Sequence, residues 1–290
     1  MPGNVTYFSD KEYLTNALVE NDFKFTSFTN IKNMKQIKTL TVILAAFVFT
    51  AKAQTAKHED TEFYSPVPKV VMPAAMPGQP PSDAVILFDG SSLDEWVPTK
   101  DSTSSNKWDL KKNIMTVNKA NGDLQTKRRF TDFQLHIEYR IPKNITGQDQ
   151  ARGNSGIFLA ALPWGAGGYE LQVLDNFNNE TYVNGQAGSM YKQSPPLVNA
   201  CRKPGEWQAY DVVWTAPRFN KDGSLKLPAR VTAIHNGILV QNNTILKGDT
   251  PFIGQPEYRQ HGAAPIKLQA HGDKSEPISY RNIWVRELSN

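Results

Sequence analysis

The run that most constrains the fold is TDFQLHIEYRI, residues 131–141, in which apolar and polar side chains alternate strictly. A period of two is typical of a β-strand that buries one face. The buried face would carry Phe133, Leu135, Ile137, Tyr139 and Ile141. The opposite face would carry Gln134, His136, Glu138 and Arg140.

Further strand-like runs follow, separated by clusters of Gly, Pro and Asn: SGIFLA, YELQVL, WQAYDVVWTA, ARVTAIHNG, PIKLQAHG and ISYRNIWVREL. The sequence shows no convincing amphipathic helix after residue 83, and Asn236-Gly237 between strand formers predicts a hairpin. We therefore predict one all-β domain over residues 83–290, a jelly-roll β-sandwich of antiparallel strands. Its length exceeds the roughly 100 residues of an immunoglobulin-type sandwich.

Three segments precede this domain. Residues 34–53 have a basic start, an apolar run and the motif Ala51-Lys52-Ala53, the layout of a secretory signal peptide. The apolar run is short for a transmembrane span, and an uncleaved anchor is the alternative. Residues 1–33 are interpreted as an upstream extension from a misplaced start, and residues 54–82 as a Pro-rich linker. We expect a periplasmic or secreted protein with no stable membrane insertion after cleavage.

Charge and cysteine content exclude some classes of function. The formal net charge is +4, and Lys and Arg form no cluster with interleaved aromatics, so no nucleic acid partner is expected. Cys201 is the only cysteine, which excludes an internal disulfide and a cysteine-based metal cluster.

The strand in GYELQVLDNF, residues 168–177, carries unexpected polar groups. Glu170 and Gln172 share one face, and Asp175 follows them. The spacing E-x-Q-x-x-D resembles the E-x-D-x-x-E of retaining β-sandwich glycosidases of the laminarinase type, which need two carboxyls about 5–5.5 Å apart. The alternative is a solvated sheet face that ends in a turn-forming Asp-Asn pair.

A second candidate cluster lies in KLQAHGDKSEPISYRNIWVREL. His271 precedes a glycine at a predicted strand end, where it could act as a base with a tunable pKa. Arg281 lies within the next strand and could pair with a carboxylate or bind a sugar oxygen. A structural histidine and a salt bridge on the sheet surface are the alternatives.

Three further residues are candidates for substrate binding. Asn154 could hydrogen-bond a ligand, Tyr191 could line a rim for sugar rings, and Lys127 could polarise a carbonyl. No cofactor is certain, because the sequence has no HExxH motif and no close pair of histidines. A divalent ion held by Glu170, Asp175 and His271 is possible in principle.

Eight ordered blocks between Val85 and Leu288 resemble the 3-keto-disaccharide hydrolase family: ILFDGSSLDEW, GDLQTKRRFTDFQLHIEYRIP, GNSGIFL, YELQVLD, GSMYKQSPP, PGEWQAYDVVW, HNG and IKLQAHGDKSEPISYRNIWVREL. This resemblance implies a concanavalin-like jelly roll, an exported protein, and action on an oligosaccharide or glycoside already oxidised at C3. In such a substrate the ketone acidifies the C2 proton, so that elimination at C1–C2 followed by hydration gives net hydrolysis.

Roles for the candidate residues follow from that chemistry as hypotheses. Glu170 and His271 would be the acid and base, and Asp175 would orient His271 or bind a metal. The C3 oxygen would be polarised by Arg281 and Lys127. The sugar hydroxyls would be held by Gln172, Asn154 and Tyr191. The alternatives are a non-catalytic glycan-binding jelly-roll module and a conventional retaining glycosidase.

Overall fold

The computed structural model describes residues 56–164 and 167–288. The predicted upstream extension and signal peptide lie outside these residues. The chain divides into two compact units, Met1–Pro68 and Lys69–Asn290, so the boundary falls within the stretch interpreted as a linker. In the first unit, residues 56–68 include one short 3₁₀ helix, η1 (His58–Thr61). Among the described residues, no helix has the length and apolarity needed to cross a membrane.

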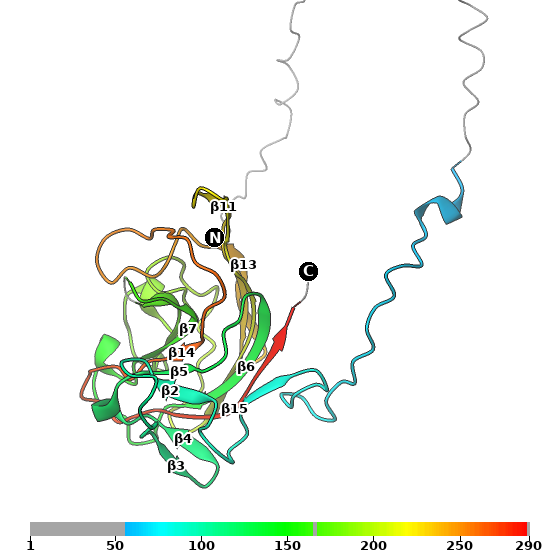
Figure 1. The fold of residues 1–290 in the computed structure, drawn as a ribbon. Helices are drawn as coiled ribbons and strands as arrows, with labels where there is room; N and C mark the ends of the chain where they lie inside the picture. Colours follow the sequence, from blue (N-terminus) through cyan, green and yellow to red (C-terminus); the bar gives the residue numbers. More distant parts are fainter. Residues whose placement is uncertain (1–55, 165–166, 289–290) are drawn as a thin grey trace, which may run out of the picture. The chain divides into compact units, whose positions relative to one another are not determined.

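The second unit is built from antiparallel sheets (Figure 1). Its larger sheet has eight strands within the described residues, in the order β13-β12-β9-β6-β15-β4-β3, with β1 also paired to β15. Their bounds are β1 (Val85–Phe88), β3 (Asp109–Lys111), β4 (Ile114–Thr116), β6 (Phe133–Arg140), β9 (Trp207–Thr215), β12 (Arg230–His235), β13 (Ile238–Ile245) and β15 (Ser279–Glu287).

The smaller sheet has five strands in the described part of the chain, in the order β2-β5-β14-β7-β8. Their bounds are β2 (Trp96–Pro98), β5 (Leu124–Thr126), β7 (Ser155–Ala161), β8 (Gly168–Val173) and β14 (Lys267–Leu268). The remaining elements are the hairpin β10 (Arg218–Phe219) with β11 (Leu225–Leu227), and the 3₁₀ helices η2 (Lys119–Asn121), η3 (Asp149–Ala151) and η4 (Val183–Gly185).

The alternating run of the sequence forms β6, in the middle of the larger sheet. Its four apolar side chains Phe133, Leu135, Ile137 and Tyr139 are fully buried and belong to the hydrophobic core. The inward face of the smaller sheet supplies the other half of this core, including Leu124, Ile157, Leu159, Leu171, Val173 and Leu268. The prediction of an antiparallel jelly-roll β-sandwich is confirmed.

The face of the smaller sheet that points away from this core is polar. On β8, Glu170 and Gln172 alternate with the core residues Leu171 and Val173, so both polar side chains lie on the outward face. Even so, all six residues of β8 are buried. One reason is that segment 188–191 pairs along the free edge of β8, for example through the bond from Tyr191 N to Glu170 O at 3.0 Å. The outward face is therefore recessed beneath loops.

Candidate active site

A cavity of about 240 Å³ lies over the outward face of β8. It is lined by Asn154, Glu170, Gln172, Tyr191, Phe252, Gln269 and His271. Five of these residues are among the eight candidates from the sequence, and they come from segments up to 117 positions apart, Asn154 to His271. We take this cavity as the candidate active site.

Glu170 occupies the floor of the cavity. On β7 its carboxyl group lies against Gly156, the residue paired with Gln172, and a Cβ atom at Gly156 would collide with this carboxyl group. The Glu170 residue is only 5% exposed. Burial raises the pKa of Glu170 to about 8, a shift that the Lys267 ammonium opposes and the Asp123 carboxylate reinforces. At neutral pH the carboxyl group therefore holds a proton that it can donate.

Two amide oxygens around the cavity are buried and have no hydrogen-bond partner among the described residues. They are Oε1 of Gln172 and Oε1 of Gln269. The other end of Gln172 is fixed, because its Nε2 donates to Asn154 Oδ1 at 3.0 Å, while Asn154 Nδ2 donates to Gln150 O at 2.7 Å. Buried polar atoms normally have partners, and a ligand that brings hydroxyl donors would satisfy these two.

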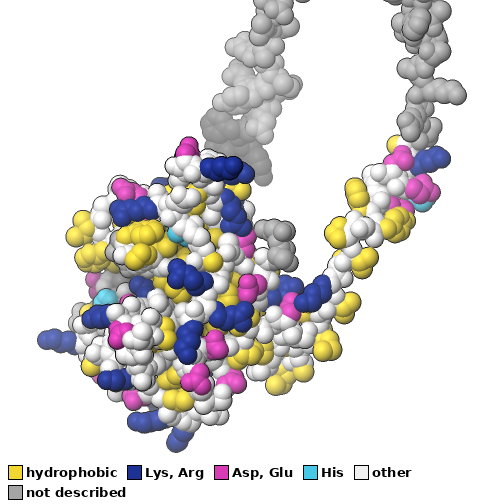
Figure 2. All heavy atoms as spheres, viewed as in Figure 1, with side chains coloured by type: hydrophobic (Ala, Val, Ile, Leu, Met, Phe, Trp, Pro, Cys, Tyr) yellow, Lys and Arg dark blue, Asp and Glu magenta, His cyan; other side chains and the backbone are white. Residues whose placement is uncertain are grey.

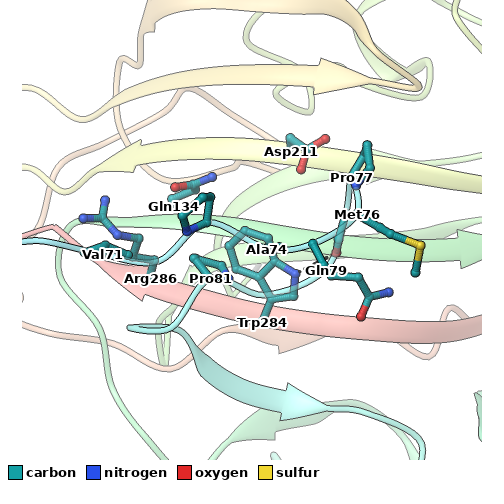
Figure 3. Close-up of a pocket in the computed structure, with 13 residues that line it drawn as sticks. Val71, Ala74, Met76, Pro77, Gln79, Pro81, Gln134, Asp211, Trp284 and Arg286 are labelled. Carbon is teal, nitrogen blue, oxygen red and sulfur yellow. Dashed lines mark hydrogen bonds between the residues drawn. The ribbon is translucent and has the colours of Figure 1, made fainter.

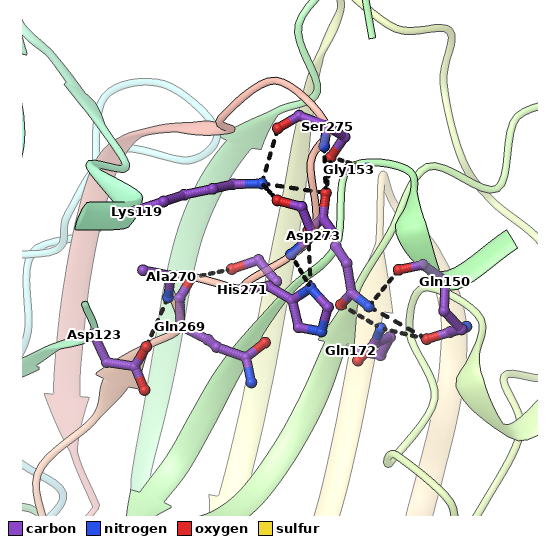
Figure 4. A network of polar contacts seen from close by, with 12 residues as sticks. Lys119, Asp123, Gln150, Gly153, Gln172, Gln269, Ala270, His271, Asp273 and Ser275 are labelled. Atoms are coloured by element: carbon purple, nitrogen blue, oxygen red, sulfur yellow. Dashed lines mark hydrogen bonds and ion pairs between the residues drawn. The ribbon is translucent and has the colours of Figure 1, made fainter. Parts of the chain in front are cut away.

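His271 is held by a polar network that continues away from the cavity (Figure 4). Its Nδ1 lies 2.8 Å from Asp273 Oδ2. Asp273 in turn accepts hydrogen bonds from the Ser275 backbone N at 2.7 Å and from Lys119 Nζ at 3.2 Å. The same ammonium group donates to the backbone oxygens of Asp273 and Ser275, each at 2.8 Å.

This network fixes the charge of Asp273. Burial alone would raise the pKa of Asp273, but the hydrogen bonds from His271, Ser275 and Lys119 together hold it well below its ordinary value. His271 Nδ1 also lies 3.3 Å from the Asp273 backbone N, but the ionised carboxylate at 2.8 Å is the closer and stronger partner. It favours the tautomer with a proton on Nδ1, and this leaves Nε2 as a base. The pair therefore has the arrangement of an oriented general base.

Tyr191 closes the cavity beside Glu170. Its hydroxyl group lies 2.5 Å from that of Tyr182, and burial raises its pKa, so the phenol stays protonated at neutral pH. Lys192 folds back over the Tyr191 ring, with its Nζ 5.6 Å from the ring centroid.

The structure does not place Asp175 in the cavity, contrary to the prediction that it orients His271 or binds a metal. β8 ends at Val173, and the fully buried Asp175 carboxylate accepts from Arg152 Nε at 2.6 Å and from the Phe177 backbone N at 3.0 Å. Asp273 orients His271 instead. In the described part of the chain, no three His, Cys, Asp or Glu side chains could hold a metal ion together, so the proposed metal set does not fit.

Arg281 and Lys127 also lie away from the cavity. Arg281 is on the outer face of the larger sheet, where its Nε donates to Glu138 Oε2 at 2.6 Å and its guanidinium carbon lies 4.2 Å from the Trp207 ring centroid. This is the salt bridge on the sheet surface that was the alternative for Arg281. Lys127 is an exposed residue directly after β5. Neither side chain lines the candidate site.

A larger cavity, of about 590 Å³, lies on the outer face of the larger sheet, beneath residues 71–82 (Figure 3). Gly78 O in this segment accepts hydrogen bonds from Asn282 Nδ2 at 2.8 Å and Trp284 Nε1 at 2.9 Å. Its charged groups are already paired: Arg286 with Asp83 at 2.8 Å, and Asp211 with His136 at 2.6 Å. These pairs leave this cavity less suited to acid–base chemistry than the cavity around Glu170.

Sequence reasoning missed four residues of the site: Asp273, Gln269, Phe252 and Lys267. Asp273 had a local signal, because an acid two positions after His271 in HGDKSEP can reach back to the imidazole. Lys267 was detectable only from the sheet register, which places it opposite Phe158, itself opposite Glu170. Its Nζ lies 3.5 Å from the Phe158 ring centroid and 3.6 Å from Asp123 Oδ2.

Comparisons with known proteins agree with this geometry. The model of the 3-keto-alpha-glucoside-1,2-lyase-like domain matches residues 83–286. A structure from Parabacteroides distasonis ATCC 8503, described as a "putative glycosyl hydrolase", is 55% identical with a TM-score of 0.73, over 80% of this chain and 97% of that one. A second protein from that strain, described in the same words, is 16% identical with a TM-score of 0.53, over 71% of this chain and 94% of that one, and shows the fold alone. The comparison with curated proteins gives no match.

Proposed function

The chain belongs to the 3-keto-alpha-glucoside-1,2-lyase-like family, and we propose that it cleaves glycosides oxidised at C3 by elimination followed by hydration. A carbohydrate-active enzyme follows from the family itself, whereas the C3 ketone is our inference. The observation that supports it best is the pairing of a protonated carboxyl group, Glu170, with an oriented base, His271, in one cavity. A proton donor and an oriented proton acceptor in one cavity suit proton transfer at two neighbouring carbons.

In the elimination step, His271 Nε2 takes the proton from C2, which the C3 ketone has made acidic. The electrons of the C2–H bond form an enolate with its negative charge on the C3 oxygen. When the enolate collapses, a C1–C2 double bond forms, the C3 ketone returns, and the C1–oxygen bond to the leaving group breaks. Glu170 donates its proton to the departing oxygen.

Hydration reverses the proton movements with water in place of the leaving group. The ionised Glu170 takes a proton from water as its oxygen adds to C1, and protonated His271 returns a proton to C2. The products are the free 3-keto sugar and the alcohol, and both catalytic groups regain their starting protonation states. The enzyme therefore needs no covalent intermediate.

Positioning groups are supplied by the remaining residues around the cavity. The unpaired oxygens of Gln172 and Gln269 would accept bonds from sugar hydroxyls. Because Arg281 and Lys127 lie elsewhere, the Gln269 amide and the Tyr191 phenol are the groups that we assign to the enolate oxygen. We also propose that residues 34–53 direct the protein to the periplasm or the cell exterior.

A retaining glycosidase mechanism is less well supported. Of the described residues that line the cavity, Glu170 alone carries a carboxylate, and that mechanism requires a second about 5–5.5 Å away. Asp175, which would have supplied it, pairs with Arg152.

The test is a mass-spectrometric assay of the purified protein on matched glucosides with and without a C3 ketone, each with and without chelator. We expect turnover of the oxidised glucoside only, loss of turnover in Glu170→Gln and in His271→Ala, and no effect of the chelator. Cleavage of the unoxidised glucoside would indicate a conventional glycosidase. Binding without turnover of either substrate would indicate a glycan-binding module.

A further inference from the structure

A second cavity, of about 340 Å³, lies next to the candidate active site. It is lined by Tyr182, Asn184, Lys192, Pro251, Gly254, Gln255 and Pro256. None of these residues takes part in the proton transfers described above.

The two cavities share a wall. Tyr191 and Phe252 line the catalytic cavity, whereas their immediate partners Tyr182 and Lys192 line the second one. The Tyr182 and Tyr191 hydroxyl groups are 2.5 Å apart. Lys192 Nζ donates to Phe252 O at 2.7 Å and lies 4.9 Å from the Phe252 ring centroid. A molecule that extends out of the catalytic cavity would therefore pass directly over this wall.

The loop over residues 251–256 exposes large apolar side chains at this wall. Phe252 is 66% exposed and Ile253 is 87% exposed, and Tyr182, in the lining of the second cavity, is 41% exposed. Figure 2 shows hydrophobic side chains gathered where this loop lies, the orange segment after β13 in Figure 1. Exposed apolar side chains grouped around a cavity are typical of a surface that is covered when a ligand binds.

We propose that the second cavity is the subsite for the leaving group, and that it takes an apolar aromatic aglycone. This inference rests on the proposed function. The Tyr182 ring offers a face or an edge to an aromatic partner, and the Lys192 ammonium can lie over its π-system. A second sugar is less well matched to this lining. Lys192 is already hydrogen-bonded to Phe252 O, and the Tyr182 hydroxyl to that of Tyr191. The other polar side chains in the lining are Asn184 and Gln255.

The test compares a phenyl and a methyl 3-keto-glucoside through the ratio of their kcat/KM values. Phenol is the better leaving group, so the informative quantity is the change in this ratio on substitution. We expect Tyr182→Ala to lower the phenyl-to-methyl ratio about tenfold, mainly through KM for the phenyl substrate. Tyr182→Phe keeps the ring without the hydroxyl group and should keep the ratio. Gln255→Trp, which fills the cavity, should lower the ratio as Tyr182→Ala does.

Leu227→Ser on the β10–β11 hairpin is the matched control, because Leu227 is a 55% exposed apolar residue outside both cavities, and the ratio should not change. An unchanged ratio in both Tyr182→Ala and Gln255→Trp would overturn the subsite. So would a Tyr182→Ala variant that loses activity equally on both substrates, since Tyr182 would then act only through Tyr191. Failure of the wild type to turn over either glucoside would instead overturn the proposed function itself.

Discussion

Burial keeps the carboxyl group of Glu170 protonated. None of the described residues forms a hydrogen bond with this carboxyl group. Because its pKa is raised from 4.5 to about 8, the group stays protonated through neutral pH and loses its proton above that value. If it is the general acid, kcat on a 3-keto-glucoside should fall tenfold per pH unit well above pH 8, as for loss of a single essential proton. A pH–rate profile measures this, and constant kcat through pH 9.5 would contradict the assignment.

Asp273 acts on the reaction through His271 and is a positioning residue. In Asp273→Asn the amide can no longer favour the Nδ1 proton of His271 by charge, so we expect kcat to fall by up to about 10⁴-fold, the loss when an aspartate that orients a general-base histidine becomes an amide. KM should change little, because Asp273 lies outside the lining of the cavity and acts only through His271. Asp94→Asn, at an exposed acid, should leave both kcat and KM unchanged. A fall in kcat accompanied by a comparable rise in KM would indicate a purely structural role for Asp273.

The absence of a side chain at Gly156 leaves the space that the Glu170 carboxyl group occupies. A Cβ at this position would overlap the carboxyl group, whereas the backbone there is not in the left-handed region, so Gly156→Ala should act through Glu170. We expect a loss of activity of at least tenfold and a destabilisation of about 1–3 kcal/mol, the usual cost of overpacking. Urea denaturation and kinetics measure the two effects. In Gly262→Ala the new methyl group meets nothing within 4 Å, and wild-type activity is expected.

At the scale of strands, the sequence predicted those features that follow from alternation. The faces of β6 and the placement of Glu170 and Gln172 opposite Leu171 and Val173 follow from a period of two. The pattern could not predict Asp175, because alternation ends where the strand ends, at Val173, and the chain then turns to bring the carboxylate to Arg152. Such a turn depends on a partner 23 positions earlier in the chain.

Strand register, which a single sequence does not reveal, decides the environment of Arg281. β15 pairs with β6 so that Arg281 lies opposite Glu138 on the larger sheet, whereas the strands that carry the cavity belong to the smaller sheet. Burial would raise the pKa of Glu138, but the nearby His136 imidazole and the hydrogen bonds from Asn282 and Arg281 lower it to about 2. The pair therefore stabilises the fold above about pH 4.5 and loses this contribution as the pH falls from there toward 2.

From this placement we expect Arg281→Met to lower the free energy of unfolding at pH 7 by about 1–3 kcal/mol, because Glu138 loses a charged partner while half-buried. The activity of the folded variant should stay near that of the wild type. The difference in stability should shrink toward pH 3. A large loss of kcat/KM with unchanged stability would return Arg281 to the role that the sequence suggested.

At the scale of the molecule, the sandwich uses its two sheets differently. Inward faces from both sheets form one hydrophobic core, and the outward face of the smaller sheet, recessed under loops, carries the candidate site. Residues 154, 170, 172, 269 and 271 meet there because the smaller sheet places β14, β7 and β8 side by side, and residues 191 and 252 reach the site from loops. Composition and periodicity predict such a sandwich, but the identity of the cavity depends on contacts between distant loops.

The central claim is that a proton leaves C2 of a 3-keto sugar during cleavage. The most direct test uses a 3-keto-glucoside that carries deuterium at C2, with mass spectrometry of the sugar product and a no-enzyme control for spontaneous exchange. We predict that turnover is slower than for the unlabelled glucoside. We also predict that hydrogen replaces the deuterium, because the His271 side chain is 35% exposed and exchanges the deuteron with water before it protonates C2. Full retention of deuterium at C2 with an unchanged rate would contradict elimination and hydration by Glu170 and His271.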